Sequence, residues 1–275
     1  MNAIVLMAIG AKYEAILEKM LPQFEAYANL CHAKLEICNE LPDPLKRGDI
    51  FTQKLLLPSI YSEYEWIAFM DLDVLISKNA PSIFLKIDPN KGFGAVLDPR
   101  DSYAFHYSNI HWHKQPNLNL VTVESLAKSR GFEANPLFHG TINGGVWLAN
   151  TKLVGKLFAD FYYQATENNS SQPIHEEMPM AYLSQTSALF FPLEDKFNKQ
   201  VIYIVSEKNT TNIYRVLKYQ KKINKLLRKF LFIKREILLR GYVDIINDAL
   251  EKNYIVHFSG NFPIPADPTN LIIHI

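Results

Sequence analysis

The sequence has few cysteines, no long apolar run and no recognisable leader. Its 2 cysteines, Cys31 and Cys38, make neither a disulfide framework nor a zinc-ligand set, so we expect reduced, partly buried thiols. No apolar stretch approaches the roughly 20 residues of a membrane span, and the first residues lack a basic segment followed by a small-residue cleavage site. These absences argue against a secreted disulfide scaffold and predict a cytoplasmic protein.

A net charge of one sign is also lacking, because 29 Lys and Arg stand against 28 Asp and Glu. Without an overall basic excess or patterned stacking aromatics, no nucleic-acid partner is expected. The balance is uneven, however, since residues 214–240 hold 10 Lys or Arg and one Glu. This segment has apolar residues at helical spacing. It is expected to be either the solvated basic face of a packed helix or a peripheral helix on an anionic membrane, at its inner face.

What the sequence does contain is the composition of a large globular domain, with 275 residues of which 48% are hydrophobic. Short apolar runs predict buried strands, and amphipathic stretches between them predict helices. The expected strands are 3–10, 33–40, 65–76, 92–98, 144–150, 200–206 and 254–260. The expected helices are 11–30, 49–58, 153–166 and 176–185. This alternation predicts one α/β domain over 1–275: a single doubly wound, mostly parallel sheet flanked by helices, with a basic helical appendage near 212–250.

Two carboxylates, Asp71 and Asp73, interrupt the apolar run 65–76. A buried, unpaired carboxylate costs several kcal/mol, so their presence needs a reason. If 65–76 is one strand, residues two apart face the same side and can meet one ligand beyond the carboxyl end of the sheet. Two close carboxylates repel unless a cation lies between them. Oxygen ligands of this kind predict Mn²⁺ or Mg²⁺ bound with a diphosphate.

Three further motifs carry polar residues next to apolar segments. Asn143 precedes paired glycines at the start of a strand, which indicates close backbone approach to a ligand or a tight turn. Glu176 and Glu177 precede a short helix, as reactive acids or as N-terminal helix charge. His257 ends the last strand, as a further metal ligand or as a structural histidine.

The motifs “DLD”, “NGGVWLAN”, “HEE” and “HFSG” follow one another in an order that resembles the nucleotide-diphosphosugar glycosyltransferases of the A-type fold. The resemblance is greatest to glycosyltransferase family 8 and its bacterial relatives, and it covers most of 1–200 together with 253–260. It implies transfer of a sugar, with retention, from a nucleotide diphosphate donor, a UDP-sugar at the family level. The implied acceptor is a saccharide or a lipid-linked glycan such as lipopolysaccharide core.

The resemblance also implies roles for residues around the diphosphate. Asp71 and Asp73 match the family's carboxylates for the metal and the donor, and His257 matches its additional metal ligand. Lys54 matches a basic position near the diphosphate, and Gly260 matches the backbone turn beside it. In family 8 a Lys, often with a Trp, follows the His-Gly motif; here “NFPIP” follows instead.

Further implied contacts reach the nucleotide and the sugar. Ala8, Gly10 and Tyr13 in “AIGAKYEA” match the family's positions at the edge of the nucleotide base. The donor sugar is lined by the segment that begins at Asn143 and Gly144, with Asp98 at a sugar hydroxyl. Glu176 and Glu177 match an acidic pair close to the reacting centre.

Two other functions compete with this interpretation. A nucleotidyltransferase also joins a metal to a sugar nucleotide, but it needs a Gly-rich phosphate loop directly after the first strand, which “AIGAKYEA” lacks. A sugar-nucleotide-binding protein without catalysis would keep the binding motifs and lose the reaction.

Overall fold

The computed structural model describes residues 1–98, 127–128, 130–167, 175–207, 219, 222, 226, 240–259 and 262–265. The chain divides into two compact units. Unit 1 holds 1–72, 81–98 and the described residues of 120–194. Unit 2 holds 73–80 and the described residues of 195–275. The single domain expected over 1–275 stays a prediction, and most of the basic segment 212–250 lies outside the described residues.

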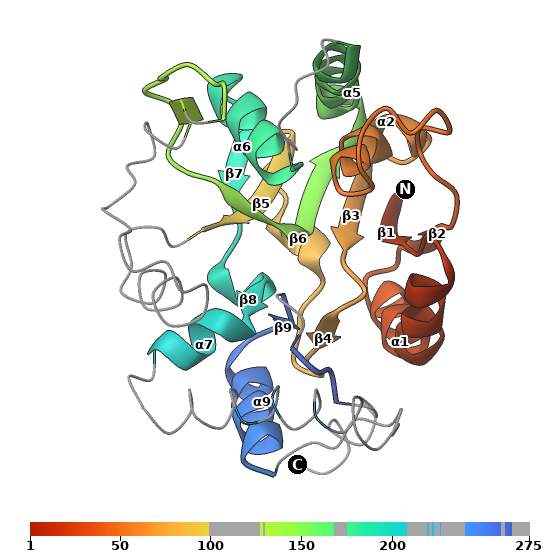
Figure 1. Ribbon diagram of the computed structural model, residues 1–275, viewed down its shortest axis with the longest axis vertical. Helices are drawn as coiled ribbons and strands as arrows, with labels where there is room; N and C mark the ends of the chain where they lie inside the picture. The colour runs from red at the N-terminus through yellow and green to blue at the C-terminus, as the bar shows by residue number, and fades with distance from the viewer. Residues whose placement is uncertain are drawn as a thin grey trace. The chain divides into compact units, whose positions relative to one another are not determined.

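Unit 1 is built on a six-stranded sheet (Figure 1). In spatial order its strands are β2 (Lys34–Cys38), β1 (Asn2–Met7), β3 (Trp66–Met70), β6 (Ile142–Asn150), β5 (Phe93–Leu97) and β7 (Phe190–Pro192). β1 runs parallel to β2 and β3, and β5 runs parallel to β7. Only β6 runs against its neighbours β3 and β5. The mostly parallel α/β sheet predicted from the sequence is confirmed.

The helices of unit 1 bury the apolar strands. α1 (Ala11–Leu30) packs on β1 and β2. The short helices η1 (Thr52–Leu56) and α2 (Leu57–Ile60) contact α5 (Thr151–Glu167), which in turn contacts α6 (Glu177–Thr186). A further short helix, η2, covers Ile83–Lys86.

The strands are apolar on both faces because both faces are covered. In β1, Ala3 and Val5 belong to a core cluster that also holds Trp147. Ile4 and Leu6, which alternation turns to the opposite face, are equally inaccessible. Strands buried in this way are expected as nearly continuous hydrophobic runs, and this is what the sequence contains.

Unit 2 holds a three-stranded sheet of β4 (Val74–Ile76), β9 (Ile255–His257) and β8 (Lys199–Gln200). The central strand β9 is antiparallel to β4 and parallel to β8. The helix η3 (Asp195–Phe197) precedes β8, α7 (Val201–Glu207) follows it, and α9 (Arg240–Lys252) precedes β9.

The prediction of one strand over 65–76 is wrong. β3 ends at Met70, and the backbone N–H of Asp71 donates to the carbonyl of Gly145 at 2.8 Å, at the end of the pairing with β6. After Leu72 the chain leaves this sheet. The carbonyl of Asp73 accepts from the N–H of Phe258 at 2.8 Å, and β4 then pairs with β9. The two aspartates therefore lie between strands of different sheets.

The strand expected at 200–206 is also wrong, because Gln200 alone lies in a strand, β8, and 201–206 belong to helix α7. Its β-branched residues favour a strand locally. In the helix, however, Val201, Ile202 and Ile204 are all less than 9% exposed. Burial of these side chains outweighs a propensity difference of a few tenths of a kcal/mol per residue.

The structure also shows the two cysteines and the apolar character of the helices. Cys31 and Cys38 are both buried free thiols, as expected. Of the helices formed by the described residues, none has the length and apolar character needed to cross a membrane.

Candidate active site

Lys54 stands among acidic side chains in unit 1. Its ammonium nitrogen lies 2.9 Å from Oδ1 of Asp71 and 3.0 Å from Oε1 of Glu176. It also lies 3.5 Å from the carbonyl oxygen of Gly144. Lys54 is 3% exposed and sits over the ring of Phe69, 4.8 Å from its centroid. Burial by itself disfavours the ammonium, but the two carboxylates outweigh it and raise the pKa of Lys54. The side chain is therefore a permanent buried cation.

This geometry gives Lys54 a role that the sequence did not predict. An ammonium has three N–H donors, and the two carboxylates and the Gly144 carbonyl can accept all three. Lys54 thus ties Asp71, the residue directly after β3, to the start of α6, where Glu176 is the N-cap residue. Its contact with a diphosphate stays a prediction.

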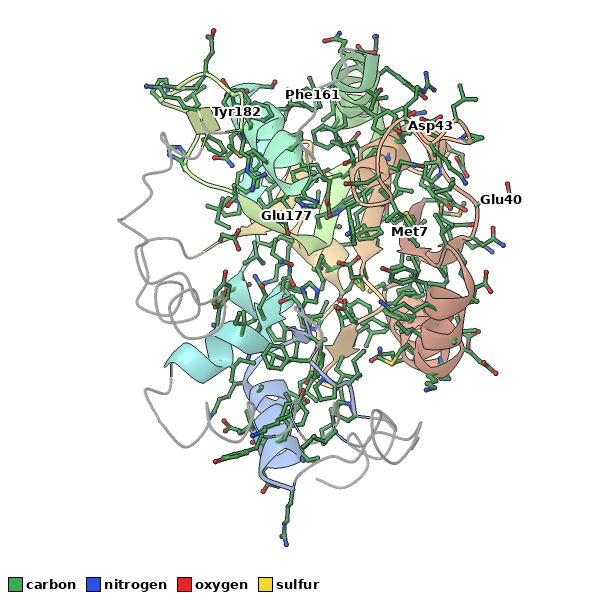
Figure 2. The ribbon with its side chains drawn as sticks, viewed as in Figure 1. Met7, Glu40, Asp43, Phe161, Glu177 and Tyr182 are labelled. Carbon is green, nitrogen blue, oxygen red and sulfur yellow. The ribbon has the colours of Figure 1, made fainter. Side chains whose placement is uncertain are left out.

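Glu177 is anchored to the start of β6. Its Oε1 accepts from the backbone N–H of Gly144 at 2.9 Å and lies 3.5 Å from Nδ2 of Asn143. Glu177 is labelled in Figure 2. A Cβ at position 144 would lie 2.6 Å from Oε1 of Glu176 and 3.1 Å from Cγ of Glu177. A larger residue here would have to displace the Glu176 carboxylate, whose Oε1 lies 3.0 Å from the Lys54 ammonium. Because Gly144 lies within β6, the tight turn considered from the sequence is wrong.

The environment of the acidic pair favours proton uptake. Desolvation raises the pKa of Glu177 to about 8, and the negative charges of Glu176 and Asp98 add to the effect. Burial likewise raises the pKa of Glu176, against the opposing charge of Lys54. A carboxyl group with a pKa near the working pH is suited to accept and return a proton.

Glu177→Gln should make stability less sensitive to pH. The pKa of about 8 in the folded chain lies above the usual value of about 4.3 for an unfolded glutamate. Folded Glu177 therefore holds a proton that the unfolded chain releases, and stability falls as pH rises through this window. Glutamine cannot ionise, so its advantage over glutamate should grow by about 4 kcal/mol between pH 5 and pH 9. Urea unfolding at pH 5, 7 and 9 measures it.

The control for this experiment is Glu25→Gln, on the exposed side of α1. Its free energy of unfolding relative to the unchanged chain should differ little between the three pH values. If the free energy of unfolding of Glu177→Gln relative to the unchanged chain were equally independent of pH, this would contradict a desolvated Glu177 with a raised pKa.

Asp98, at the end of β5, is held by the segment that leads into β6. Its N–H donates to the carbonyl of Thr141 at 2.8 Å, and the Thr141 hydroxyl donates to Oδ2 of Asp98 at 3.0 Å. This segment is fixed by Gln185 of α6, which sequence reasoning missed. The Gln185 amide donates to the Gly140 carbonyl at 2.8 Å and accepts from the His139 N–H at 2.6 Å. Nothing local marks Gln185, since its partners are distant in sequence.

The residues expected at the nucleotide lie where β1 ends and α1 begins. Ala8 is fully buried, and its N–H donates to the carbonyl of Cys38 at 2.9 Å. Gly10 has φ of 86°, a left-handed conformation that favours glycine, and its carbonyl accepts from the Tyr13 N–H at 2.9 Å. Gly260 lies outside the described residues.

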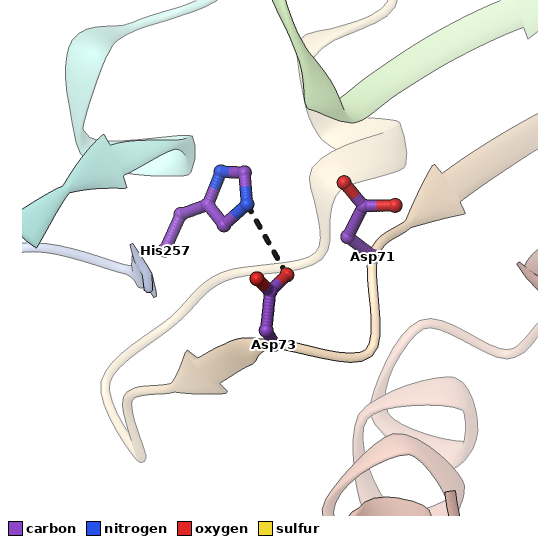
Figure 3. A group of neighbouring side chains, drawn as sticks. All are labelled: Asp71, Asp73 and His257. Atoms are coloured by element: carbon purple, nitrogen blue, oxygen red, sulfur yellow. Dashed lines mark ion pairs between the residues drawn. The ribbon is translucent and has the colours of Figure 1, made fainter. Parts of the chain in front are cut away.

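Unit 2 brings Asp73 and His257 together. In the register of β4 and β9, Val74 pairs with His257, which sets Asp73 beside the imidazole. Nε2 of His257 lies 3.2 Å from Oδ1 of Asp73 (Figure 3). The other ring nitrogen, Nδ1, lies 3.0 Å from Oδ1 of Asn198. Sequence reasoning missed Asn198, which reaches the histidine only because β8 pairs with β9.

The Asp73–His257 pair fits a hard divalent cation. The carboxylate oxygen is the kind of ligand that hard ions prefer, and the imidazole nitrogen adds a ligand of the kind that first-row transition-metal ions accept, which favours Mn²⁺ over Mg²⁺. Around an octahedral ion with ligands at about 2.1 Å, neighbouring ligand atoms lie roughly 3 Å apart. The separation of 3.2 Å between Nε2 and Oδ1 is close to this value. Asp71, joined to Asp73 through Leu72 alone, adds a second carboxylate nearby in the chain.

No protein-family model and no curated protein matches the sequence. Among solved structures, a glycosyltransferase involved in the glycosylation of the major capsid of PBCV-1 is similar, with 12% identity over 99% of this chain and 97% of that one, at a TM-score of 0.50. The galactosyltransferase LgtC, in complex with donor and acceptor sugar analogs, has 13% sequence identity over 94% of this chain and 87% of that one, at a TM-score of 0.51. The bifunctional glycosyltransferase WbbM has 11% identity over 94% of this chain and 46% of that one, also at a TM-score of 0.51. Likeness at this level shows the fold: the chain has the A-type glycosyltransferase fold.

Proposed function

We propose that this chain is a metal-dependent glycosyltransferase. It takes a sugar from a nucleotide diphosphate donor, a UDP-sugar, and transfers it with retention to a saccharide or lipid-linked glycan. The observation that carries the proposal is the 3.2 Å pairing of Asp73 with His257, residues from distant parts of the chain. It is supported by the fold, since the solved structures of the same fold named above are glycosyltransferases, one of them in complex with donor and acceptor sugar analogs.

The proposed metal ligands are Asp71, Asp73 and His257, which offer two carboxylates and one imidazole to Mn²⁺ or Mg²⁺. When bound, such an ion neutralises the charge that builds on a departing diphosphate. Lys54 contributes by holding the Asp71 carboxylate at 2.9 Å, so that the carboxylate is oriented before any ligand arrives. Gly260 is proposed at the diphosphate.

On the sugar side we propose that Glu176, Glu177 and Asn143 surround the reacting carbon, with Gly144 and Asp98 at the sugar. Glu177 as a residue is only partly buried, although its carboxyl group is desolvated enough to raise its pKa. In its ionised form, which becomes dominant only as the pH rises through its pKa of about 8, Glu177 would stabilise the positive charge of an oxocarbenium-like state. In a retaining reaction the acceptor attacks from the leaving-group face and the diphosphate takes its proton. In the inverting alternative, Glu177 takes that proton as general base.

The remaining donor contacts are proposed at the end of β1. Gly10 and Tyr13 would meet the nucleotide base, in accordance with the exposed position of Gly10 at the start of α1, and the fully buried Ala8 would support this edge from within. Contact of the basic segment 212–250 with an anionic membrane stays a prediction, because most of that segment lies outside the described residues.

A thermal-shift screen of donors tests the proposal. With Mn²⁺ present, a UDP-sugar at about 100 times its Kd should stabilise the chain by about 2.7 kcal/mol, which corresponds to roughly 5–10 °C in Tm for a chain of this size. The shift should shrink when EDTA replaces Mn²⁺. The anomeric configuration of the sugar that is released or transferred, read by NMR, then decides between retention and inversion.

Other patterns in the same screen identify the competing functions. Stabilisation by nucleoside triphosphates alone would indicate a nucleotidyltransferase. Stabilisation by UDP-sugars without hydrolysis or transfer would indicate a binding protein. No shift with any nucleotide or nucleotide sugar would contradict all three.

A further inference from the structure

We infer that Asn198 is a positioning residue that selects the tautomer of His257 and so directs Nε2 toward a divalent cation. The inference rests on the proposed metal site. It assigns a role to a residue that does not touch the metal itself.

The contact is direct and enclosed. Oδ1 of Asn198 lies 3.0 Å from Nδ1 of His257, while Nε2, the other ring nitrogen, faces Asp73 at 3.2 Å. Asn198 is 2% exposed and His257 is 4% exposed. Bulk water therefore has little access to Nδ1, and the Asn198 amide oxygen is within hydrogen-bond distance of it.

The chemistry of the two side chains fixes the direction of the hydrogen bond. An amide oxygen only accepts, so facing Nδ1 it requires an N–H there. In a neutral imidazole the lone pair then lies on Nε2, on the side of Asp73, where a cation can share the two ligands. A reversed amide would donate to Nδ1 and leave the hydrogen on Nε2. That hydrogen would point at the carboxylate and occupy the position of the metal.

The backbone holds Asn198 in place. It lies between η3 and β8, and its N–H donates to the Asp195 carbonyl at 3.2 Å. In the parallel pairing of β8 with β9, Gln200 is level with His257. The amide thus lies directly before β8, the strand that pairs with the strand of His257. Partners of this kind, which orient a ligating histidine through its second nitrogen, commonly change metal affinity 10–100-fold when removed.

The first test reads the tautomer in the unchanged protein. The chain is labelled with ¹⁵N-histidine, and the ring nitrogens are observed by long-range ¹H–¹⁵N correlation at about pH 8.5, above the usual imidazole pKa, with and without Mg²⁺. The missing signal in His257→Gln identifies the residue. We expect hydrogen on Nδ1 in both conditions, and none on Nε2 once Mg²⁺ is bound, because without the ion the Asp73 carboxylate itself accepts from an N–H on Nε2. A spectrum of the Mg²⁺-bound protein that places the hydrogen on Nε2, or one that shows none on Nδ1, overturns the inference.

The second test measures Mn²⁺ binding directly, from the electron paramagnetic resonance signal of the free ion. Asn198→Leu removes the acceptor and should weaken binding about 10–100-fold. Asn198→Asp keeps an acceptor and should bind within about 3-fold of the unchanged chain. The matched control is Asn253→Leu, because the Asn253 amide donates to the Ala249 carbonyl in the same unit. It should leave binding unchanged.

The outcomes separate this inference from the proposed function. If the unchanged protein binds no Mn²⁺, the proposed metal site fails, and the role of Asn198 toward it fails with it. If Mn²⁺ binds but Nε2 carries the hydrogen, or if Asn198→Leu binds as tightly as Asn253→Leu, only the role of Asn198 fails. Should Asn198→Leu not fold, weak binding by the folded Asn198→Asp variant or the wrong tautomer would still overturn it.

Discussion

Lys54→Met should lower the free energy of unfolding by about 3–5 kcal/mol, the usual cost of removing one partner from a buried ion pair. Methionine keeps the length of the side chain but leaves two carboxylates without their cation. The Glu176 side chain is 5% exposed and that of Asp71 is 28% exposed, so water can solvate only one of them well. Urea unfolding at neutral pH measures the loss, and donor turnover should fall with it because Asp71 is no longer held.

Lys86→Met is the matched control. Lys86 also pairs with a glutamate, Glu194, but these side chains are 34% and 48% exposed. Removing such a pair usually costs less than about 1 kcal/mol. Adding Glu176→Met to Lys54→Met should recover part of the lost stability without recovering activity, because it removes a buried unpaired charge. A loss below 1 kcal/mol for Lys54→Met alone would show that the ammonium does not organise the site.

Asp73→Asn should reduce metal-dependent donor hydrolysis by about 10³-fold while the chain stays folded. The substitution removes a ligand charge worth several kcal/mol to a bound cation, and about 4 kcal/mol corresponds to that factor. The backbone contact from the Phe258 N–H to the Asp73 carbonyl, at 2.8 Å, needs no carboxylate and should persist. The rates of UDP-sugar hydrolysis by the unchanged chain and by Asp73→Asn, each measured with Mn²⁺ and with EDTA, give the factor by which the metal-dependent rate falls. The unfolding midpoint verifies the fold.

Asp248→Asn serves as the comparison, since Asp248 is also an acid of unit 2 and pairs with Lys252 within α9. Its activity should stay within about 2-fold of the unchanged chain, because exposed pairs of this kind contribute little. Activity that survives EDTA in both the unchanged chain and Asp73→Asn would end the proposal of a catalytic metal.

The fold was largely predictable because each strand of the main sheet is marked by its own composition. β1 and β3 are short apolar runs, and both are buried on two faces. α5 and α6 carry apolar residues at helical spacing and contact each other. Patterns that repeat within a few residues are visible in a sequence, and they determined the α/β class.

Local patterns failed where a segment's partner lies far away. The run 65–76 has strand composition throughout, yet it is divided between two sheets because its second half pairs with β9. The run 200–206 has strand composition too, yet it is helical and buries three of its aliphatic residues. In both cases packing against distant residues outweighed local preference.

The sequence by itself determined which residue types are present for a metal and a sugar: Asp73, His257, Glu177 and the glycine that lets Glu177 approach β6. Only the tertiary structure decided that Lys54 contacts two acids and that Asn198 contacts His257. The physical reason is that composition and spacing report what a segment can form. Hydrogen bonds and ion pairs form only when two atoms lie within about 3 Å of each other. Here that proximity comes from the pairing of strands that are distant in the sequence.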